Sequence, residues 1–93
     1  MNKQAYIYKT NGEIIPVLPV NRSDFSLSEL QSFVNGSIEI VYLDDATCMI
    51  VNEEGKLLDL KPNVEATRLY SLNKGNFDFI CGNALVTPIK YIK

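Results

Sequence analysis

Residues Ile38–Asn52 read IEIVYLDDATCMIVN and contain the clearest pair of strands in the chain. Two apolar runs, Ile38–Leu43 and Thr47–Asn52, flank a short polar link at residues 44–46, which predicts an antiparallel hairpin. Both faces of each run are largely apolar, which is typical of strands that are covered on two sides. We therefore expect both strands to lie in the centre of a sheet, with Lys56–Leu60 adding a third strand to form a meander.

A second hairpin is predicted at the N-terminus. The runs Ala5–Lys9 and Glu13–Leu18 have strand character, and Asn11-Gly12 between them is a strong hairpin signal because both residue types tolerate positive φ. Pro16 has no N–H to donate to a neighbouring strand, so the second of these strands is expected at a sheet edge.

The first helix is predicted over Leu27–Asn35. Ser26 and Glu29 have the spacing of a capping box, in which each side chain accepts a hydrogen bond from the other residue's backbone N–H. Gly36 stands where a left-handed residue would end the helix. The apolar face is expected to consist of Leu27, Leu30, Phe33 and Val34.

A second short helix is predicted over Val64–Tyr70, with Asn63 as its N-cap. Two strand-like runs follow, Phe77–Cys81 and Ala84–Thr87, interrupted at Gly82 by a bulge or a close backbone contact. The chain is therefore expected to form one α+β domain over residues 1–93. It should be a mainly antiparallel sheet of about five or six strands with two short helices.

Composition narrows the class of protein. The 93 residues are 46% hydrophobic and carry a net charge of −2, so we expect no general attraction to nucleic acid or to an anionic membrane. The N-terminal residues show no signal-peptide pattern and no apolar run has membrane-spanning length, which predicts a cytoplasmic protein. Cys48 and Cys81 are expected to be buried thiols, since a reducing compartment disfavours a disulfide.

Residue types also bear on catalysis. The chain has no histidine, which excludes a Ser-His or Cys-His nucleophile and the usual zinc spacings. The paired carboxylates Asp44-Asp45 and Glu53-Glu54 are expected on turns at opposite ends of the predicted hairpin, where they do not converge. We therefore predict no catalytic residue, no metal site and no cofactor.

One polar set is a candidate binding surface. Asn52 and Asn63 suit turn-satisfying and capping roles, but they could share a surface on which Arg68 recognises an anion or a carboxylate. Gly82 marks a place where a ligand or partner backbone could approach closely. The full set is Asn52, Asn63, Thr67, Arg68, Gly82 and Asn83.

The turn and strand signals of Gly36–Val86 resemble a known family. The runs that carry the resemblance are Val51–Leu57, Pro62-Asn63, Ala66-Thr67 and Cys81–Val86. They are similar to the family catalogued as domain of unknown function 3846. The resemblance implies an origin in bacteria, phages or mobile elements. It implies no assigned activity and no catalytic residues.

Three functions are compatible with the sequence. The first is a non-catalytic binding or regulatory module that acts through contact with an unknown protein partner, which could be a second copy in a homodimer. Exposed strand edges near Pro16 and in the tail around Tyr91 favour it. The second is a small-ligand-binding or enzymatic domain that uses Asn52, Asn63, Arg68 and Asn83. The third is a weakly acidic mobile-element protein that antagonises a host nucleic-acid-binding factor.

Overall fold

The structure, a computed structural model, describes residues 4–74 and 79–92. Its five strands form one antiparallel sheet in the order β2-β1-β5-β4-β3. The strands are β1 (Ala5–Tyr8), β2 (Ile14–Val17), β3 (Ile38–Tyr42), β4 (Thr47–Asn52) and β5 (Ala84–Pro88). The helices are α1 (Leu27–Val34), α2 (Val64–Lys74) and the 3₁₀ turn η1 (Ile89–Tyr91). The α+β class and the five-stranded antiparallel sheet are as predicted.

The sheet is built from two hairpins that β5 joins. β1 and β2 form the N-terminal hairpin, and the N–H of Gly12, at φ 95°, donates to the carbonyl of Lys9. β3 and β4 form the other hairpin, and β5 pairs with β1 on one side and β4 on the other. The last strand of the chain therefore occupies the centre of the sheet.

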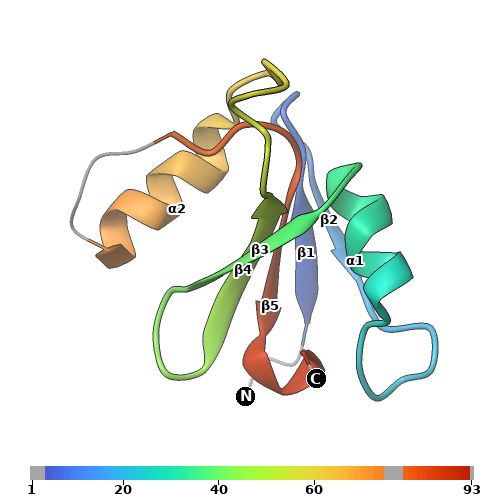
Figure 1. The fold of residues 1–93 in the computed structure, drawn as a ribbon. Helices are drawn as coiled ribbons and strands as arrows, with labels where there is room; N and C mark the ends of the chain where they lie inside the picture. The colour runs from blue at the N-terminus through green and yellow to red at the C-terminus, as the bar shows by residue number, and fades with distance from the viewer. Residues whose placement is uncertain (1–3, 75–78, 93) are drawn as a thin grey trace.

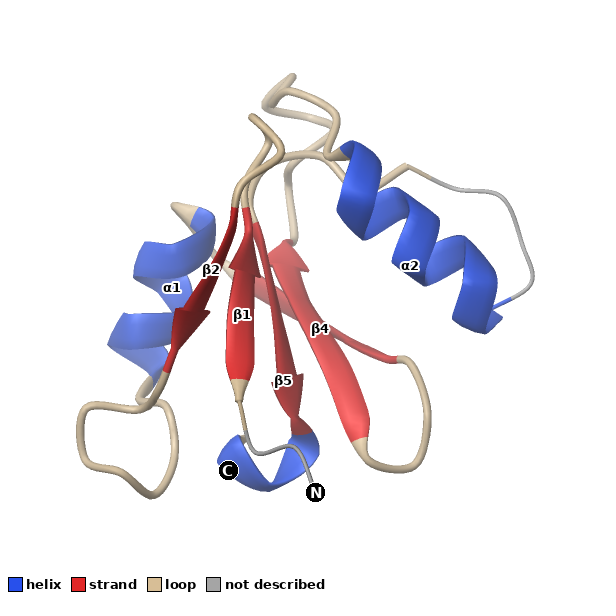
Figure 2. Cartoon of the chain, turned by 180° about the vertical axis from the view of Figure 1, so that it is seen from behind, coloured by secondary structure: helices blue, strands red, loops and turns tan. Residues whose placement is uncertain are grey.

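The two long helices lie on opposite sides of the sheet (Figures 1 and 2). On the α1 side, Leu30 and Val34 of the helix pack in one core with sheet residues such as Ile50 and Leu85. On the α2 side, Ala66 packs in a second core whose buried sheet residues are Met49, Val51 and Ala84. Figure 1 shows that α2 leans away from the sheet towards its C-terminal end, whereas α1 lies along it.

The first helix follows its predicted capping box. The N–H of Glu29 donates to the Ser26 hydroxyl at 3.1 Å, and the N–H of Ser26 donates to the Glu29 carboxylate at 2.7 Å. Two details differ from the prediction. Asn35, not Gly36, adopts the left-handed conformation that ends the helix, at φ 62°. Leu27, which was expected on the apolar face, is 59% exposed, whereas Leu30 and Val34 are buried.

The predicted meander is wrong in two respects. Lys56–Leu60 forms turns rather than a strand, so the other neighbour of β4 is β5. β3 was expected in the centre of the sheet, but it forms an edge. Over residues 56–60 the backbone bonds locally, because the N–H of Leu58 donates to the carbonyl of Glu54 and the N–H of Leu60 donates to the carbonyl of Gly55. Strand order depends on pairing between distant segments, which the sequence of one strand does not show.

The C-terminal third also differs from the prediction. The second helix continues beyond Tyr70 to Lys74. The strand expected over Phe77–Cys81 lies partly outside the described residues, and Cys81 forms only an isolated bridge with Pro62. Tyr91 belongs to η1, so the tail offers no strand edge there.

The capping box predicts a pH dependence of stability. Hydrogen bonds from the backbone N–H groups of Ser26 and Val20 lower the pKa of Glu29. A lowered pKa in the folded chain stabilises the fold above the pKa of the unfolded chain, near 4.5, and this contribution is lost as the pH falls through the folded pKa. Glu29→Gln should therefore lower the melting temperature at pH 7. The difference in melting temperature between wild type and variant should become smaller as the pH falls below the pKa of Glu29 in the folded chain. A gap that stays constant with pH would contradict a role for the charge.

Candidate functional site

Four of the six predicted site residues meet at one polar junction beside the first turn of α2. Asn63 is completely buried, and its side-chain amide donates to the carbonyls of Tyr8 at 2.8 Å and Gly82 at 3.0 Å. Its side-chain oxygen accepts the N–H of Ala66 at 3.1 Å, which is the predicted N-cap. One amide thus ties α2 to the end of β1 and to the segment that leads into β5.

The other members of the junction reinforce the same connection. The Thr67 hydroxyl accepts the N–H of Ile80 at 2.9 Å, and Asn83 accepts the N–H of Thr10 at 3.0 Å. Gly82 has φ 87°, a left-handed conformation in which a side chain is strained. A Cβ at Gly82 would also lie 2.8 Å from the Leu60 side chain. The junction of Asn63, Thr67, Gly82 and Asn83 therefore has a structural role, because it holds the first turn of α2 to its neighbouring segments.

The remaining two predicted residues lie elsewhere. The buried Asn52 amide donates to the carbonyl of Val34 at 3.0 Å, and its side-chain oxygen accepts the N–H of Glu54 at 2.8 Å. It ties the end of α1 to the turn after β4. Arg68 is on the exposed face of α2, 3.3 Å from the Glu65 carboxylate. The structure does not bring the six residues together into one surface.

In the part of the chain that the structure describes, one hollow lies between α2 and the β3–β4 hairpin and another lies between α2 and strands β1 and β5. The β3–β4 hollow has a volume of about 200 Å³. It is lined by Glu39, Val41, Val51, Asn52, Glu53, Gly55, Lys56, Leu57, Tyr70, Phe79, Ile80 and Cys81. The β1–β5 hollow, about 330 Å³, lies between Leu69 and Asn73 of α2 and strand residues that include Tyr6, Tyr8 and Val86. Burial, followed by the charge of Glu65, raises the pKa of Tyr8, so this phenol stays neutral at neutral pH.

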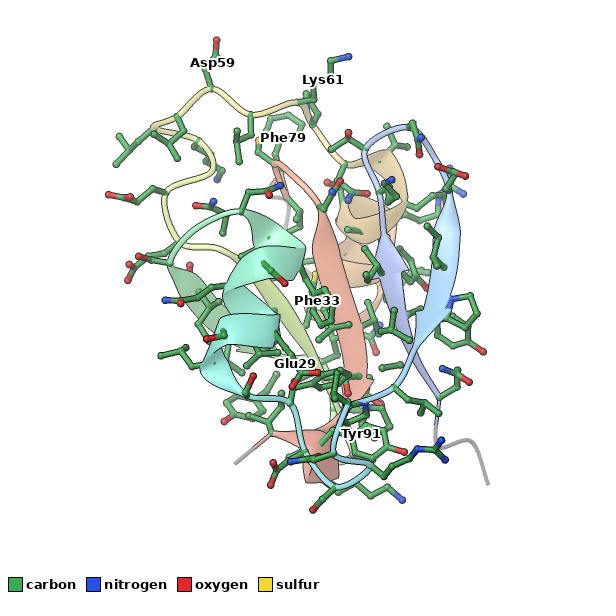
Figure 3. All side chains as sticks on the ribbon, turned by 90° about the vertical axis from the view of Figure 1, so that its right-hand side faces the viewer. Glu29, Phe33, Asp59, Lys61, Phe79 and Tyr91 are labelled. Carbon is green, nitrogen blue, oxygen red and sulfur yellow. The ribbon has the colours of Figure 1, made fainter. Side chains whose placement is uncertain are left out.

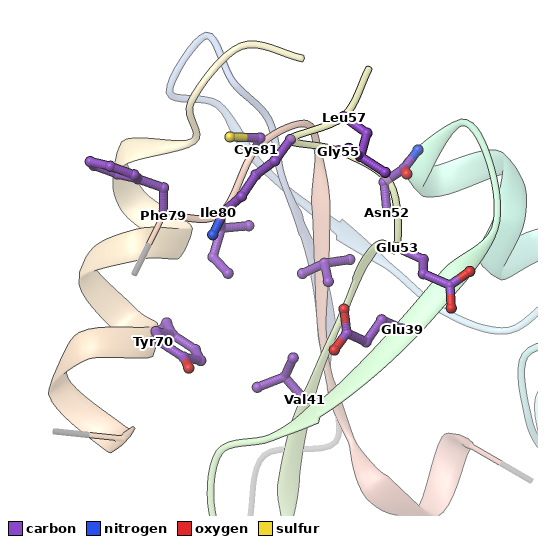
Figure 4. A pocket seen from close by; sticks show the side chains of 12 residues that line it. Glu39, Val41, Asn52, Glu53, Gly55, Leu57, Tyr70, Phe79, Ile80 and Cys81 are labelled. Atoms are coloured by element: carbon purple, nitrogen blue, oxygen red, sulfur yellow. The ribbon is translucent and has the colours of Figure 1, made fainter. Parts of the chain in front are cut away.

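The β3–β4 hollow is lined by both apolar and charged side chains. Val41 and Ile80 lie beneath it, and Figure 4 shows Glu39 extending its carboxylate towards the side of the hollow that Tyr70 occupies. At the rim, Leu57 is 84% exposed and Phe79 is 54% exposed. Figure 3 places Phe79 at the end of the molecule that also carries Asp59 and Lys61.

Most residues of this hollow escaped the sequence analysis. They come from β3, the end of β4, the turns over residues 53–59, α2 and residues 79–81, and no local motif links these segments. A local signal for this hollow is Leu57, a large apolar residue that follows the turn residues Glu53-Glu54-Gly55. Because Lys56–Leu60 was predicted to be a strand, the exposure of Leu57 was not expected.

The fold and its hollows define a small α+β domain with open space beneath its second helix. The family model for the domain of unknown function DUF3846 matches residues 6–91, so the chain belongs to that family. The match extends beyond Gly36–Val86, the span that carries the sequence resemblance. No curated protein and no solved structure matches the chain.

Two further searches concern metals and membranes. Within residues 4–74 and 79–92, no group of three or more Cys, Asp or Glu side chains is arranged to hold a metal ion. In the same part of the chain, neither helix has the length and apolar character needed to cross a bilayer.

The junction predicts a large effect of replacing its central amide. Asn63→Ala would remove the N-cap and leave two carbonyls without their buried donor, which should lower the free energy of unfolding by about 3 kcal/mol. Urea denaturation measures this loss. Asn73→Ala, at an exposed position of α2, is the matched control and should change stability by less than about 0.5 kcal/mol. Equal losses of stability at both positions would contradict the structural role of the junction.

The two cysteines should react at different rates with a thiol reagent. Both are free thiols, and Cys81 is half-buried at the wall of the β3–β4 hollow. Cys48 is completely buried in the α1-side core, and this burial raises its pKa to about 11. Under native conditions Cys81 should react first, and Cys48 should react only as the protein unfolds. In Cys81→Ser the fast phase should disappear; if it persisted, Cys48 would have to be accessible in the folded protein.

Proposed function

We propose that the protein is a non-catalytic binding module that acts through contact with another protein, and that the β3–β4 hollow receives an apolar side chain of that partner. The exposed apolar rim carries this proposal. Leu57 is a large aliphatic side chain that packing leaves almost wholly in water, and it lines a hollow together with the apolar side chains of Val41 and Ile80. Exposed apolar residues that gather around a concavity are typical of interaction sites.

Charge supports a partner of particular chemistry. Two carboxylates, Glu39 and Glu53, line the hollow together with one cation, Lys56, so the charges on its lining sum to −1. A partner segment with an apolar side chain beside a lysine or arginine would match both the apolar and the acidic side chains of the lining. The partner that we propose is therefore a basic-apolar segment of another protein.

The two alternatives have weaker support. A ligand site made by Asn52, Asn63, Arg68 and Asn83 would need these residues around one hollow, and only Asn52 lines either of the two. An antagonist of a nucleic-acid-binding factor would present its carboxylates in a row, whereas Asp44-Asp45 and Glu53-Glu54 lie at opposite ends of the β3–β4 hairpin.

The proposed setting is the cytoplasm. Cys48 and Cys81 are both free thiols, which suits a reducing compartment.

Peptide display tests the proposed partner chemistry. Random peptides selected on the immobilised protein should converge on an apolar residue next to lysine or arginine. Leu57→Ser should reduce the affinity of these peptides about tenfold, because the apolar contact at the rim is lost. In Glu39→Lys the selected charge should change from basic to acidic.

The matched control is Glu54→Lys. It makes the same change of charge at an exposed position that does not line the hollow, so the selected sequences should stay the same. Peptides that bind wild type and Leu57→Ser equally, or a selection that yields no shared sequence, would refute the proposal.

A further inference from the structure

β3 has the composition of a central strand but stands at the edge of the sheet. Ile38 and Ile40 pack against the α1-side core, and Val41 packs against the α2-side core. Exposed edges normally carry charged residues, proline or a bulge that discourages further pairing. β2, the opposite edge, has Pro16 in its middle, whereas the IEIVY sequence of β3 has no proline and a single charged residue, Glu39.

The backbone of β3 shows which groups face this open edge. The N–H of Leu43 donates to the carbonyl of Thr47 at 2.9 Å, and the N–H of Glu53 donates to the carbonyl of Ser37 at 2.9 Å. Because hydrogen-bonded pairs alternate along an antiparallel ladder, the odd-numbered residues 37–43 bond to β4. Ile38 and Ile40 therefore turn their N–H and C=O groups away from β4, towards the open edge.

We infer that this edge pairs with β3 of a second copy of the chain, antiparallel and around a two-fold axis perpendicular to the sheet. Ile40 then lies opposite Ile40 of the second copy, and the two residues exchange both of their N–H···O=C hydrogen bonds. Glu39 lies opposite Val41 of the second copy, and Ile38 lies opposite Tyr42. The two sheets become one continuous sheet of ten strands, with both α2 helices on the same face.

Charge selects this register over its neighbours. A two-fold axis perpendicular to the sheet requires one residue to lie opposite itself. If that residue were Glu39, two carboxylates would face each other, which is unfavourable. If it were Val41, Ile38 would face the carboxylate of Asp44. With Ile40 at the axis, Glu39, the one charged residue of β3, lies opposite Val41 of the second copy. All five residues of β3 then pair with β3 of the second copy.

In this register, each residue of β3 has a compatible neighbour in β3 of the second copy. This self-complementarity favours a second copy of the chain as the partner. Tyr42, which is 55% exposed, gains an apolar neighbour in Ile38 of the second copy. The contact is a single short strand, so the buried area lies at the low end of specific interfaces. The dimer should therefore be reversible and depend on concentration.

Sedimentation velocity over a concentration series tests the pairing. Wild type should shift from monomer to dimer as the concentration rises. Val41→Lys places an ammonium opposite Glu39 of the second copy and should tighten the dimer, whereas Val41→Glu places a carboxylate there and should weaken it. Each dimer contains two pairs of Glu39 with residue 41 of the other copy. The dissociation constants of the two variants should therefore differ by about tenfold.

The two variants control for each other, because both lose the same valine packing. Circular dichroism should show both folded at the measuring temperature. Adding Glu39→Lys to Val41→Lys should cancel the gain, because two cations then face each other. Three outcomes would overturn the inference: wild type that stays monomeric at all concentrations, variants that shift dimerisation in the same direction, and a double variant that dimerises as tightly as Val41→Lys.

Discussion

The buried amide of Asn63 is the constraint on which the arrangement of α2 depends. It joins three segments far apart in sequence: the end of β1, the first turn of α2 and Gly82 just before β5. A buried amide left without partners would destabilise the fold, so the position of each segment is fixed by the other two. The hydrogen bond from Asn83 to the backbone of Thr10 strengthens the same junction.

This junction also explains the open space beneath α2. The hydrogen bonds of the junction to α2 all involve the first turn of the helix. There the small side chain of Ala66 is fully buried in the α2-side core. Further along, Leu69 and Tyr70 are only half-buried, and Leu72 lies largely in solvent. The helix is thus fixed at one end and leans outward at the other (Figure 1), which leaves a hollow on each side.

Features set by neighbouring residues were predictable from the sequence, and those set by distant contacts were not. The Ser26–Glu29 capping box, the Asn11-Gly12 hairpin and the Asn63 cap depend on residues a few positions apart. The order of the strands depends on β5 entering between the two hairpins, and nothing within Ala84–Pro88 encodes its neighbours. Asn63 could be predicted as a cap, but its bonds to Tyr8 and Gly82 required the fold.

The way α2 is held has a consequence for specificity. A hollow whose wall is anchored at one end adapts its width to its occupant more easily than a cavity enclosed by packed elements. Such a site discriminates poorly between side chains that differ only in size. For the binding role that we propose, discrimination among partners would then come from the fixed groups, chiefly Glu39 on β3. Under the same proposal, related chains could change their choice of partner by replacing one or two charges, while the fold stays the same.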